Sequence, residues 1–188
     1  MAIVYNSAPD AESTASTIAA TNSVQCKAYK CNISDMQAVN AMVDSVVADF
    51  GGLDIMVANA GVAYDFPAED CTPDLLAQTM RVNFDGSFWC ARKAAEVWKK
   101  TDTFGNVIFT TSMSATIVNV PDKQAVASVI GSAESMLRFW DKRTDIMTVL
   151  VQCVQGRTSP SCKKPVNRVV GHLQSQLHQP RVYIHRND

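Results

Sequence analysis

Apolar and polar positions follow two alternating periods from the start of the chain to about residue 125. Short apolar runs typical of buried strands stand at Ala2–Tyr5, Val24–Lys30, Leu53–Ala58 and Asn106–Thr111. Between these runs, apolar residues recur every three to four positions, which is the period of an amphipathic helix. Alternating strand and helix units predict an α/β domain with a parallel sheet and right-handed crossovers.

Two helices are predicted with particular clarity. The first follows Asp35, a residue suited to an N-cap, and Gly51-Gly52 ends it. Its apolar positions share one helical face: Val39, Met42, Val43, Val46, Val47 and Phe50. The second is a long helix over residues 73–100, opened by Pro73 in its first turn. Asn83 lies in the middle of this helix, where asparagine is disfavoured, so a local backbone distortion is expected there.

The pattern weakens beyond residue 125. Residues 126–150 show only weak helical periodicity, and the chain from Gln152 onward is polar and basic with few apolar runs. We therefore predict a folded domain over residues 1–125 and an aberrant, poorly ordered tail over residues 126–188.

Composition narrows the classes of function. The chain has 188 residues, 47% of them apolar and 19% charged, with a net charge of −1. This balance gives no reason to expect nucleic acid or an anionic membrane as partner. The opening residues lack the basic and apolar regions of a signal peptide, so a cytosolic protein is expected. The six cysteines contain no Cys-x-x-Cys pair and the three histidines are not clustered, which favours buried free thiols and no metal site.

Three groups of polar residues stand where an open parallel sheet binds ligands, beyond the carboxyl ends of its strands. Asn59, Ala60 and Gly61 follow a buried strand, and Ser114 follows the strand that ends near Thr111. Asn83, in the long helix, lies between them in sequence. Each motif by itself has a structural explanation, such as a turn or a core asparagine, but the order of the three is specific.

In this order the motifs resemble the short-chain dehydrogenase/reductase family. Segments 54–61 and 112–121 are most similar to its fungal NADP-dependent polyol and ketose reductases. The resemblance implies a Rossmann-type doubly wound sheet and the reduction of a carbonyl group to an alcohol. It implies that Asn59, Ala60 and Gly61 line the cofactor, that Asn83 holds a water in a proton relay and that Ser114 hydrogen-bonds the substrate.

The resemblance also implies which nicotinamide cofactor is used. Asn32 occupies the position where the family usually has an aspartate beside the adenine. Asn6 and Ser7 follow the strand that, in NAD-using members, ends in an acidic residue for the ribose hydroxyls. Without a carboxylate there, a 2′-phosphate is not repelled, so NADP is favoured.

Two parts of the family pattern are missing. The first strand and its Gly-rich phosphate loop are expected before Ile3, so the sheet is predicted to be incomplete, with an unpaired apolar edge. The family's catalytic tyrosine and lysine fall on Ala127 and Gly131. A chain without that phenol and ammonium is expected to be catalytically inactive.

Residues 151–188 also suggest a translational origin for the unusual tail. Back-translated and read one nucleotide later, Val151–Gln155 can encode Tyr-Asn-Ala-Ser-Lys, the missing motif. The hypothesis is that residues 151–188 are translated out of frame and that residues 126–150 are an insertion. Two readings of the chain stay open. It is a member of an oxidoreductase lineage, or it is a non-catalytic fragment. Such a fragment either forms oligomers with homologous subunits through helix 73–100 or is the product of a mis-spliced or wrongly predicted gene.

Overall fold

The computed structural model describes residues 1–64, 68–112, 144–151 and 183–185. In chain order the elements are β1 (Ala2–Tyr5), α1 (Ala11–Asn22), β2 (Lys27–Lys30), α2 (Met36–Phe50), β3 (Ile55–Ala58), the short 3-10 helix η1 (Ala68–Asp70), α3 (Pro73–Met80), the π-helical segment η2 (Arg81–Gly86), α4 (Ser87–Thr101), β4 (Gly105–Ser112), β5 (Thr144–Val151) and β6 (Tyr183–His185).

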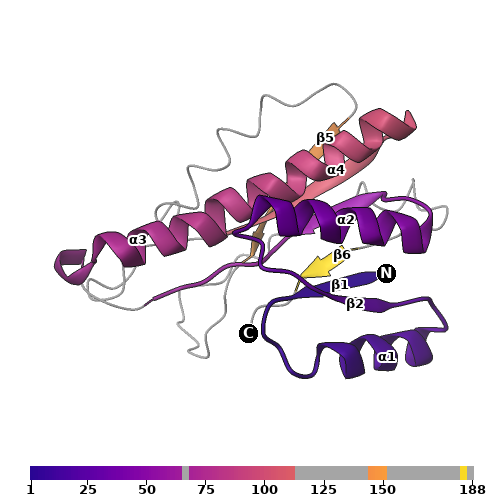
Figure 1. Cartoon of the computed structure of the whole chain (residues 1–188), viewed down its shortest axis with the longest axis horizontal. Coiled ribbons are helices and arrows are strands. Elements are labelled where there is room, and N and C mark those ends of the chain that lie inside the picture. The colour runs from indigo at the N-terminus through magenta and orange to yellow at the C-terminus, as the bar shows by residue number, and fades with distance from the viewer. Residues whose placement is uncertain (65–67, 113–143, 152–182, 186–188) are drawn as a thin grey trace, which may run out of the picture.

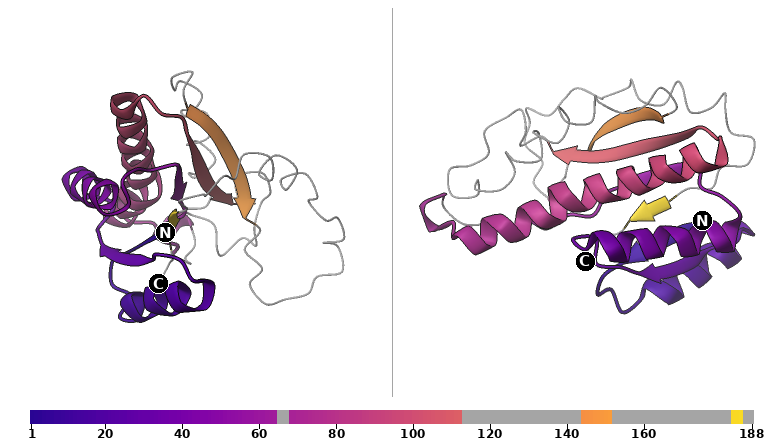
Figure 2. Two further views of the ribbon diagram at one scale, coloured as in Figure 1. Left: turned by 90° about the vertical axis from the view of Figure 1, so that its right-hand side faces the viewer. Right: turned by 45° about the horizontal axis from the view of Figure 1, so that its top comes forward.

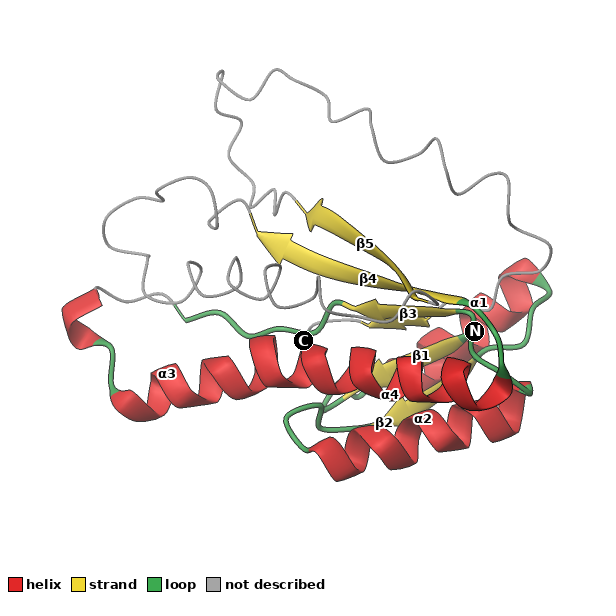
Figure 3. Ribbon diagram, turned by 90° about the horizontal axis from the view of Figure 1, so that it is seen from above, coloured by secondary structure: helices red, strands yellow, loops and turns green. Residues whose placement is uncertain are grey.

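The strands form two parallel sheets of three strands each, in the orders β2-β1-β6 and β3-β4-β5. Figure 3 shows β3, β4 and β5 as one group, with β1 and β2 beside them. The predicted α/β class with a parallel sheet is confirmed. The strand predicted from residue 24 begins at Lys27, and the one predicted from residue 53 begins at Ile55.

The edge of β1 is paired, contrary to the sequence prediction. Ala2, Ile3 and Val4 are in parallel register with Tyr183, Ile184 and His185 of β6. β6 also lies next to β3, although no ladder joins these two described strands. It therefore stands between the two groups of strands (Figure 1). The physical reason for the difference is that an apolar strand edge with open N–H and C=O groups accepts any extended segment that reaches it.

Both β5 and β6 fall inside the range 126–188, for which the sequence predicted poor order. β5 pairs with β4 in parallel along its whole length, from Gly105 opposite Thr144 to Ser112 opposite Val151. Residues 144–151 are thus a strand, and not part of the weak helix that residues 126–150 suggested. Figure 2 shows β5 alongside β4. The division of the chain at residue 125 remains a prediction.

Helices cover both sides of β1 and β2. α1 lies on one side of these strands and α2 on the other (Figure 1). Because successive side chains of a strand point to opposite faces, Ala2 and Val4 join the core beneath α2, whereas Ile3 is buried outside that cluster. The main core lies under α2 and α4, with Val39, Val43, Val46, Met56, Ala58, Ala94, Trp98 and Phe109 among its buried members.

The ends of α2 were predicted correctly, and the contacts explain why. The Asp35 carboxylate accepts hydrogen bonds from the backbone N–H of Gln37 and Ala38, two donors that have no partner within the helix. At the other end, Gly51 takes a φ of 74°, the left-handed conformation that glycine adopts at little cost. Of the residues expected on the apolar face, Val39, Met42, Val43 and Val46 are buried.

α4 is fastened to the start of β3 and β4 through one tryptophan. Trp98 Nε1 donates a 2.6 Å hydrogen bond to the Leu53 carbonyl, so this buried indole has a partner. The indole ring lies directly against Gly105, where any Cβ would collide with it. Among the described helices, none combines the length and apolar character needed to cross a membrane.

Candidate functional site

The first candidate residues lie where β1 and β2 end. Tyr5 of β1 is in register with Lys30 of β2, so the residues that follow the two strands emerge at the same edge of the sheet. Asn6 and Ser7 follow β1 and are exposed, and Asn32 follows β2 and is also exposed. The structure thus brings these three predicted cofactor residues to one side of the domain, in the position that nucleotide-binding parallel sheets use.

The Asn32 side chain also shapes its own loop. Its Oδ1 accepts hydrogen bonds from the backbone N–H of Ser34 at 3.1 Å and from the Ser34 hydroxyl at 2.8 Å. This Asx-type turn carries the chain from β2 toward the Asp35 cap of α2. An asparagine here therefore has a local structural role, and its position beside an adenine stays a prediction.

A second pair of loops meets at the ends of β3 and β4. Ala58 is in register with Phe109, so the following residues, Asn59 and Thr110, lie opposite each other. The Thr110 hydroxyl donates a 2.8 Å hydrogen bond to Asn59 Oδ1. Thr110 was not among the predicted site residues. The parallel register of the two strands is the signal that could have identified it.

The Asn83 side chain is held by two hydrogen bonds to the backbone of Val62. It is 7% exposed. Its Oδ1 accepts a 2.7 Å bond from the Val62 N–H, and its Nδ2 donates a 2.8 Å bond to the Val62 carbonyl. A Cβ on Gly61 would stand 3.1 Å from Asn83 Oδ1, so a residue without a side chain allows this close approach. The structure thus joins two predicted motifs, Asn59–Gly61 and Asn83, through the backbone of Val62.

The backbone around Asn83 is distorted, as the sequence predicted. Arg81–Gly86 form a π-helical segment between α3 and α4, a feature often found at functional sites. Gly86 is buried, and a Cβ there would lie 2.6 Å from Ile33 Cδ1 and 3.1 Å from the Ile33 carbonyl oxygen. The absence of a side chain at Gly86 thus lets the distorted helix lie against the loop that contains Asn32.

Two buried thiols lie in the protein interior near this region. Burial, with a smaller contribution from the Asp35 carboxylate, raises the pKa of Cys31 to about 11. Burial, with a smaller contribution from Cys31, raises the pKa of Cys90 to about 12. Both thiols are therefore neutral near pH 7. Cys26, Cys31, Cys71 and Cys90 are all free within the described part of the chain, in line with the free thiols expected from the sequence.

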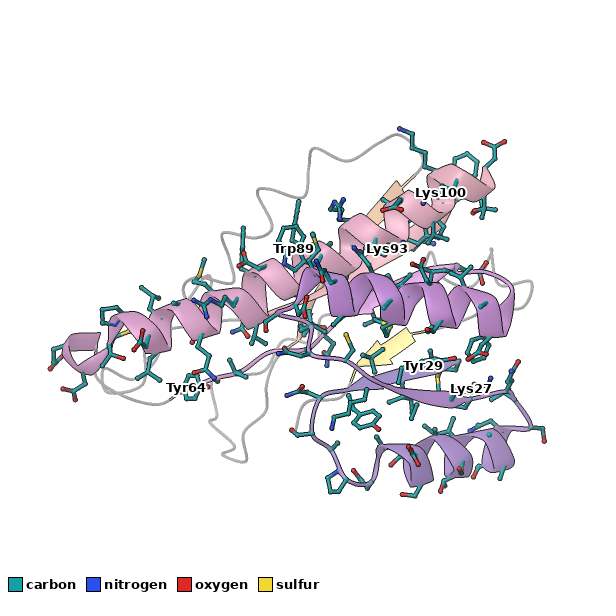
Figure 4. All side chains as sticks on the ribbon, viewed as in Figure 1. Lys27, Tyr29, Tyr64, Trp89, Lys93 and Lys100 are labelled. Carbon is teal, nitrogen blue, oxygen red and sulfur yellow. The ribbon has the colours of Figure 1, made fainter. Side chains whose placement is uncertain are left out.

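Lys93 lies on one side of α2, and Lys27 and Tyr29 lie on the other (Figure 4). The Lys93 side chain of α4 is 7% exposed and reaches Asp44 of α2 at 2.8 Å. On β2, Lys27 and Tyr29 both contact Asp49 near the end of α2. These contacts hold α2 in place over the sheet.

Several predicted positions lie outside the described residues. They are Ser114 and the two positions that match the family's tyrosine and lysine, Ala127 and Gly131. Over residues 1–64, 68–112 and the two later strands, no group of three or more histidine, cysteine, aspartate or glutamate residues is placed to hold a metal ion.

Residues 1–155 match the family model for short chain dehydrogenases. The chain belongs to the short-chain dehydrogenase family. The match passes residue 125 and includes β5, the strand that extends the β3–β4 sheet.

The relatives that this family member matches include fungal sugar reductases. The chain is 40% identical to a sorbose reductase from Candida albicans over 127 residues, which are 66% of this chain and 44% of that protein. It is 35% identical to an L-xylulose reductase from Hypocrea jecorina over 170 residues, 79% of this chain and 59% of that protein. The chain thus spans about half the length of the relatives it matches.

Solved structures agree with this family assignment. An NADPH-dependent 3-quinuclidinone reductase from Rhodotorula rubra is 32% identical and superposes with a TM-score of 0.70, covering 79% of this chain and 58% of that one. A short chain dehydrogenase from Mycobacterium smegmatis superposes with a TM-score of 0.74 over 80% of this chain and 65% of that one, and at 18% identity it supports the fold alone.

Proposed function

We propose that the chain derives from an NADP-dependent oxidoreductase that reduces a ketose or a similar carbonyl compound to an alcohol, and that it does not catalyse this reaction itself. The observation that carries the first half is the Asn59–Thr110 hydrogen bond, which ties together the loops after β3 and β4. An open parallel sheet binds its ligand beyond the carboxyl ends of its strands, which is where these loops lie. The names of the sorbose and L-xylulose reductases supply the proposed substrate class.

The residues that follow β1 and β2 fit the adenosine half of NADP. Asn6 and Ser7 are exposed directly after β1, and neither would repel a 2′-phosphate. Asn32 is exposed after β2, where it can face an adenine. Asn59, Ala60 and Gly61 would lie along the ribose and nicotinamide. When bound, the cofactor supplies the hydride, and the protein supplies position and proton transfer.

The second half of the proposal concerns the proton. Reduction of a carbonyl needs an acid beside the developing alkoxide. Ser114 can donate a hydrogen bond to that oxygen, but a serine hydroxyl does not release its proton near neutral pH. The family's tyrosine falls on Ala127 and its lysine on Gly131, and neither side chain can donate or accept a proton.

The test is consumption of NADPH by the purified full-length chain with sorbose, xylulose and fructose. We expect no consumption above the buffer rate, and the same result for Ser114→Ala. Turnover in the unmodified chain that disappears in Ser114→Ala would overturn the proposed inactivity. Quenching of tryptophan fluorescence by NADPH, measured separately, tests whether the cofactor still binds.

The exposed side of α3 favours a second candidate function, a non-catalytic subunit that associates through the helix over residues 73–100. Leu76 is 41% exposed there, and an associating subunit would cover it. Light scattering with the unmodified chain and Leu76→Glu tests self-association: a dimer or tetramer that dissociates in the variant supports it, and a monomer in both excludes self-association through this helix. The cytosolic location expected from the sequence stays a prediction.

A further inference from the structure

The Asn32 side chain is oriented by two donors from one neighbouring residue. Its Oδ1 accepts a hydrogen bond from the Ser34 N–H at 3.1 Å and another from the Ser34 hydroxyl at 2.8 Å. A backbone N–H can only donate, so the atom that faces it must be the amide oxygen. Turning the amide over would place its NH2 group against the Ser34 N–H, with two donors facing each other. The loop therefore fixes which end of the Asn32 amide is turned toward Ser34.

The other end of the amide is left for a ligand. Asn32 is exposed, and its Nδ2 has no hydrogen-bond partner among the residues that the structure describes. This atom carries two N–H donors and is no acceptor. The carboxylate that follows does not supply the missing acceptor in its place, because Asp35 Oδ1 accepts from the N–H of Gln37 and Ala38 and is directed toward the first turn of α2.

This donor stands at the edge of the sheet where the adenosine half of NADP is proposed to bind. Tyr5 and Lys30 are in register at the ends of β1 and β2, so Asn32 follows its strand beside the loop that begins with Asn6. In adenine the group at position 6 is an amine that donates, whereas N7 accepts; hypoxanthine has a carbonyl at position 6, which accepts. A carboxylate after β2 would match the amine. The Asn32 Nδ2 matches a carbonyl or a ring nitrogen instead.

We propose that Asn32 determines the base specificity of this site: it donates from Nδ2 to an acceptor on the purine, so the site does not discriminate against a base with a carbonyl in place of the 6-amine. The inference rests on the proposed function, because it concerns the base of the cofactor proposed to bind there. Asn32 is a specificity-determining residue in this proposal and takes no part in hydride or proton transfer.

The test compares the binding of NADPH with that of its analogue in which hypoxanthine replaces adenine. The fluorescence of the reduced nicotinamide measures both dissociation constants with the full-length chain. The two ligands have the same charge, so the ratio of their dissociation constants reports on the base alone. We expect the unmodified chain to bind the hypoxanthine analogue no more than about three-fold more weakly than NADPH.

The matched variant is Asn32→Asp. One carboxylate oxygen can still accept from both Ser34 donors, which preserves the turn, while the other oxygen replaces the Nδ2 donor with an acceptor. The variant should shift the ratio of dissociation constants toward NADPH by at least about ten-fold, because a carboxylate accepts from the 6-amine and repels a carbonyl. Asn22→Asp adds the same charge at the end of α1 and is the control, and it should leave the ratio unchanged.

The outcomes separate this inference from the proposed function. If the unmodified chain binds NADPH at least about ten-fold more tightly than the hypoxanthine analogue, Asn32 does not act as a donor to the base and the inference is wrong. It is also wrong if Asn32→Asp leaves the ratio unchanged. In both cases the proposed cofactor stands, since NADPH binds. If neither ligand binds saturably to any of the chains, the proposed adenosine site and the inference fail together.

Discussion

The Asn83 side chain binds Val62 through both hydrogen-bonding groups of its backbone. The amide oxygen accepts from the N–H at 2.7 Å, and the amide nitrogen donates to the carbonyl at 2.8 Å. This is the pairing that a neighbouring strand would offer, supplied here by one side chain from a π-helical segment. It fixes the loop after β3 to the long helix and satisfies polar groups that are removed from water.

Replacing Asn83 should therefore destabilise the fold. We expect Asn83→Ala to lower the free energy of unfolding by about 1–3 kcal/mol, because the Val62 N–H and carbonyl lose their partners. Asn83→Asp should be at least as harmful, since a carboxylate would face the Val62 carbonyl without a donor. Urea denaturation followed by circular dichroism measures both. Gln78→Ala, at an exposed position of α3, is the control and should change stability by less than about 0.5 kcal/mol.

Two opposing effects determine the stability of the variant Gly86→Ala. Alanine in place of glycine inside a helix usually stabilises it by about 1 kcal/mol. Here a Cβ would lie 2.6 Å from Ile33 Cδ1 and 2.8 Å from Cγ1, so overpacking of about 1–3 kcal/mol should dominate. We expect Gly86→Ala to be less stable than the unmodified chain.

A double-mutant cycle identifies the cause. Ile33→Ala removes the two carbon atoms in the way, so Gly86→Ala should be less harmful in that background, with a coupling of at least about 0.5 kcal/mol. Strict additivity of the two substitutions would show that the Ile33 side chain is not what excludes a side chain at Gly86.

Lys93 tests the value of an ion pair that has one buried and one exposed side chain. Its stem is buried between α4 and α2, whereas its partner Asp44 is 64% exposed and stays hydrated without it. We expect Lys93→Met, which keeps the stem, to change the free energy of unfolding by no more than about 1 kcal/mol. Lys93→Ala should be about 2 kcal/mol less stable than Lys93→Met because it leaves a cavity. If Lys93→Met and Lys93→Ala lose equal stability in thermal or urea unfolding, the ammonium group and not the apolar stem makes the contribution.

The contact between Tyr29 and Asp49 predicts a specific pH dependence. Burial, and then the hydrogen bond to Asp49, raise the pKa of Tyr29 above its usual value near 10. The same hydrogen bond, followed by that of Lys27, lowers the pKa of Asp49. A carboxyl group whose pKa is lower in the folded chain stabilises the fold at pH values above its unfolded-state pKa, which is near 4. This stabilisation is lost as the pH falls through the folded-state pKa. A phenol whose pKa is higher in the folded chain stabilises the fold at pH values below its unfolded-state pKa, which is about 10. This stabilisation is lost as the pH rises through the folded-state pKa.

The stability difference between the unmodified chain and Tyr29→Phe should therefore be largest between about pH 5 and 9. It should shrink on both sides of that window. Urea midpoints measured from pH 3 to pH 11 provide the comparison. Lys30→Ala, on the same strand but without a described contact to Asp49, is the control, and its difference should not follow this profile. A difference for Tyr29→Phe that is flat across the range would contradict the prediction.

The sequence by itself determined the local structure and the family. Apolar periodicity placed α2 and its buried face, Asp35 and Gly51 set its ends, and Asn83 marked the distorted segment of the long helix, because each of these depends on residues close together in the chain. The motifs Asn59–Gly61 and Asn83 likewise identified the family that the match over residues 1–155 shows.

Tertiary structure decided which residues meet. The pairing of Asn83 with Val62, of Thr110 with Asn59 and of Gly86 with Ile33 joins elements far apart in sequence, and no local pattern encodes it. The largest difference is β6: three residues near the C-terminus pair with β1 at the N-terminus, where the sequence predicted an open edge. Strand pairing depends on backbone hydrogen bonds that every residue except proline can offer, so composition alone does not reveal which segment will satisfy an exposed edge.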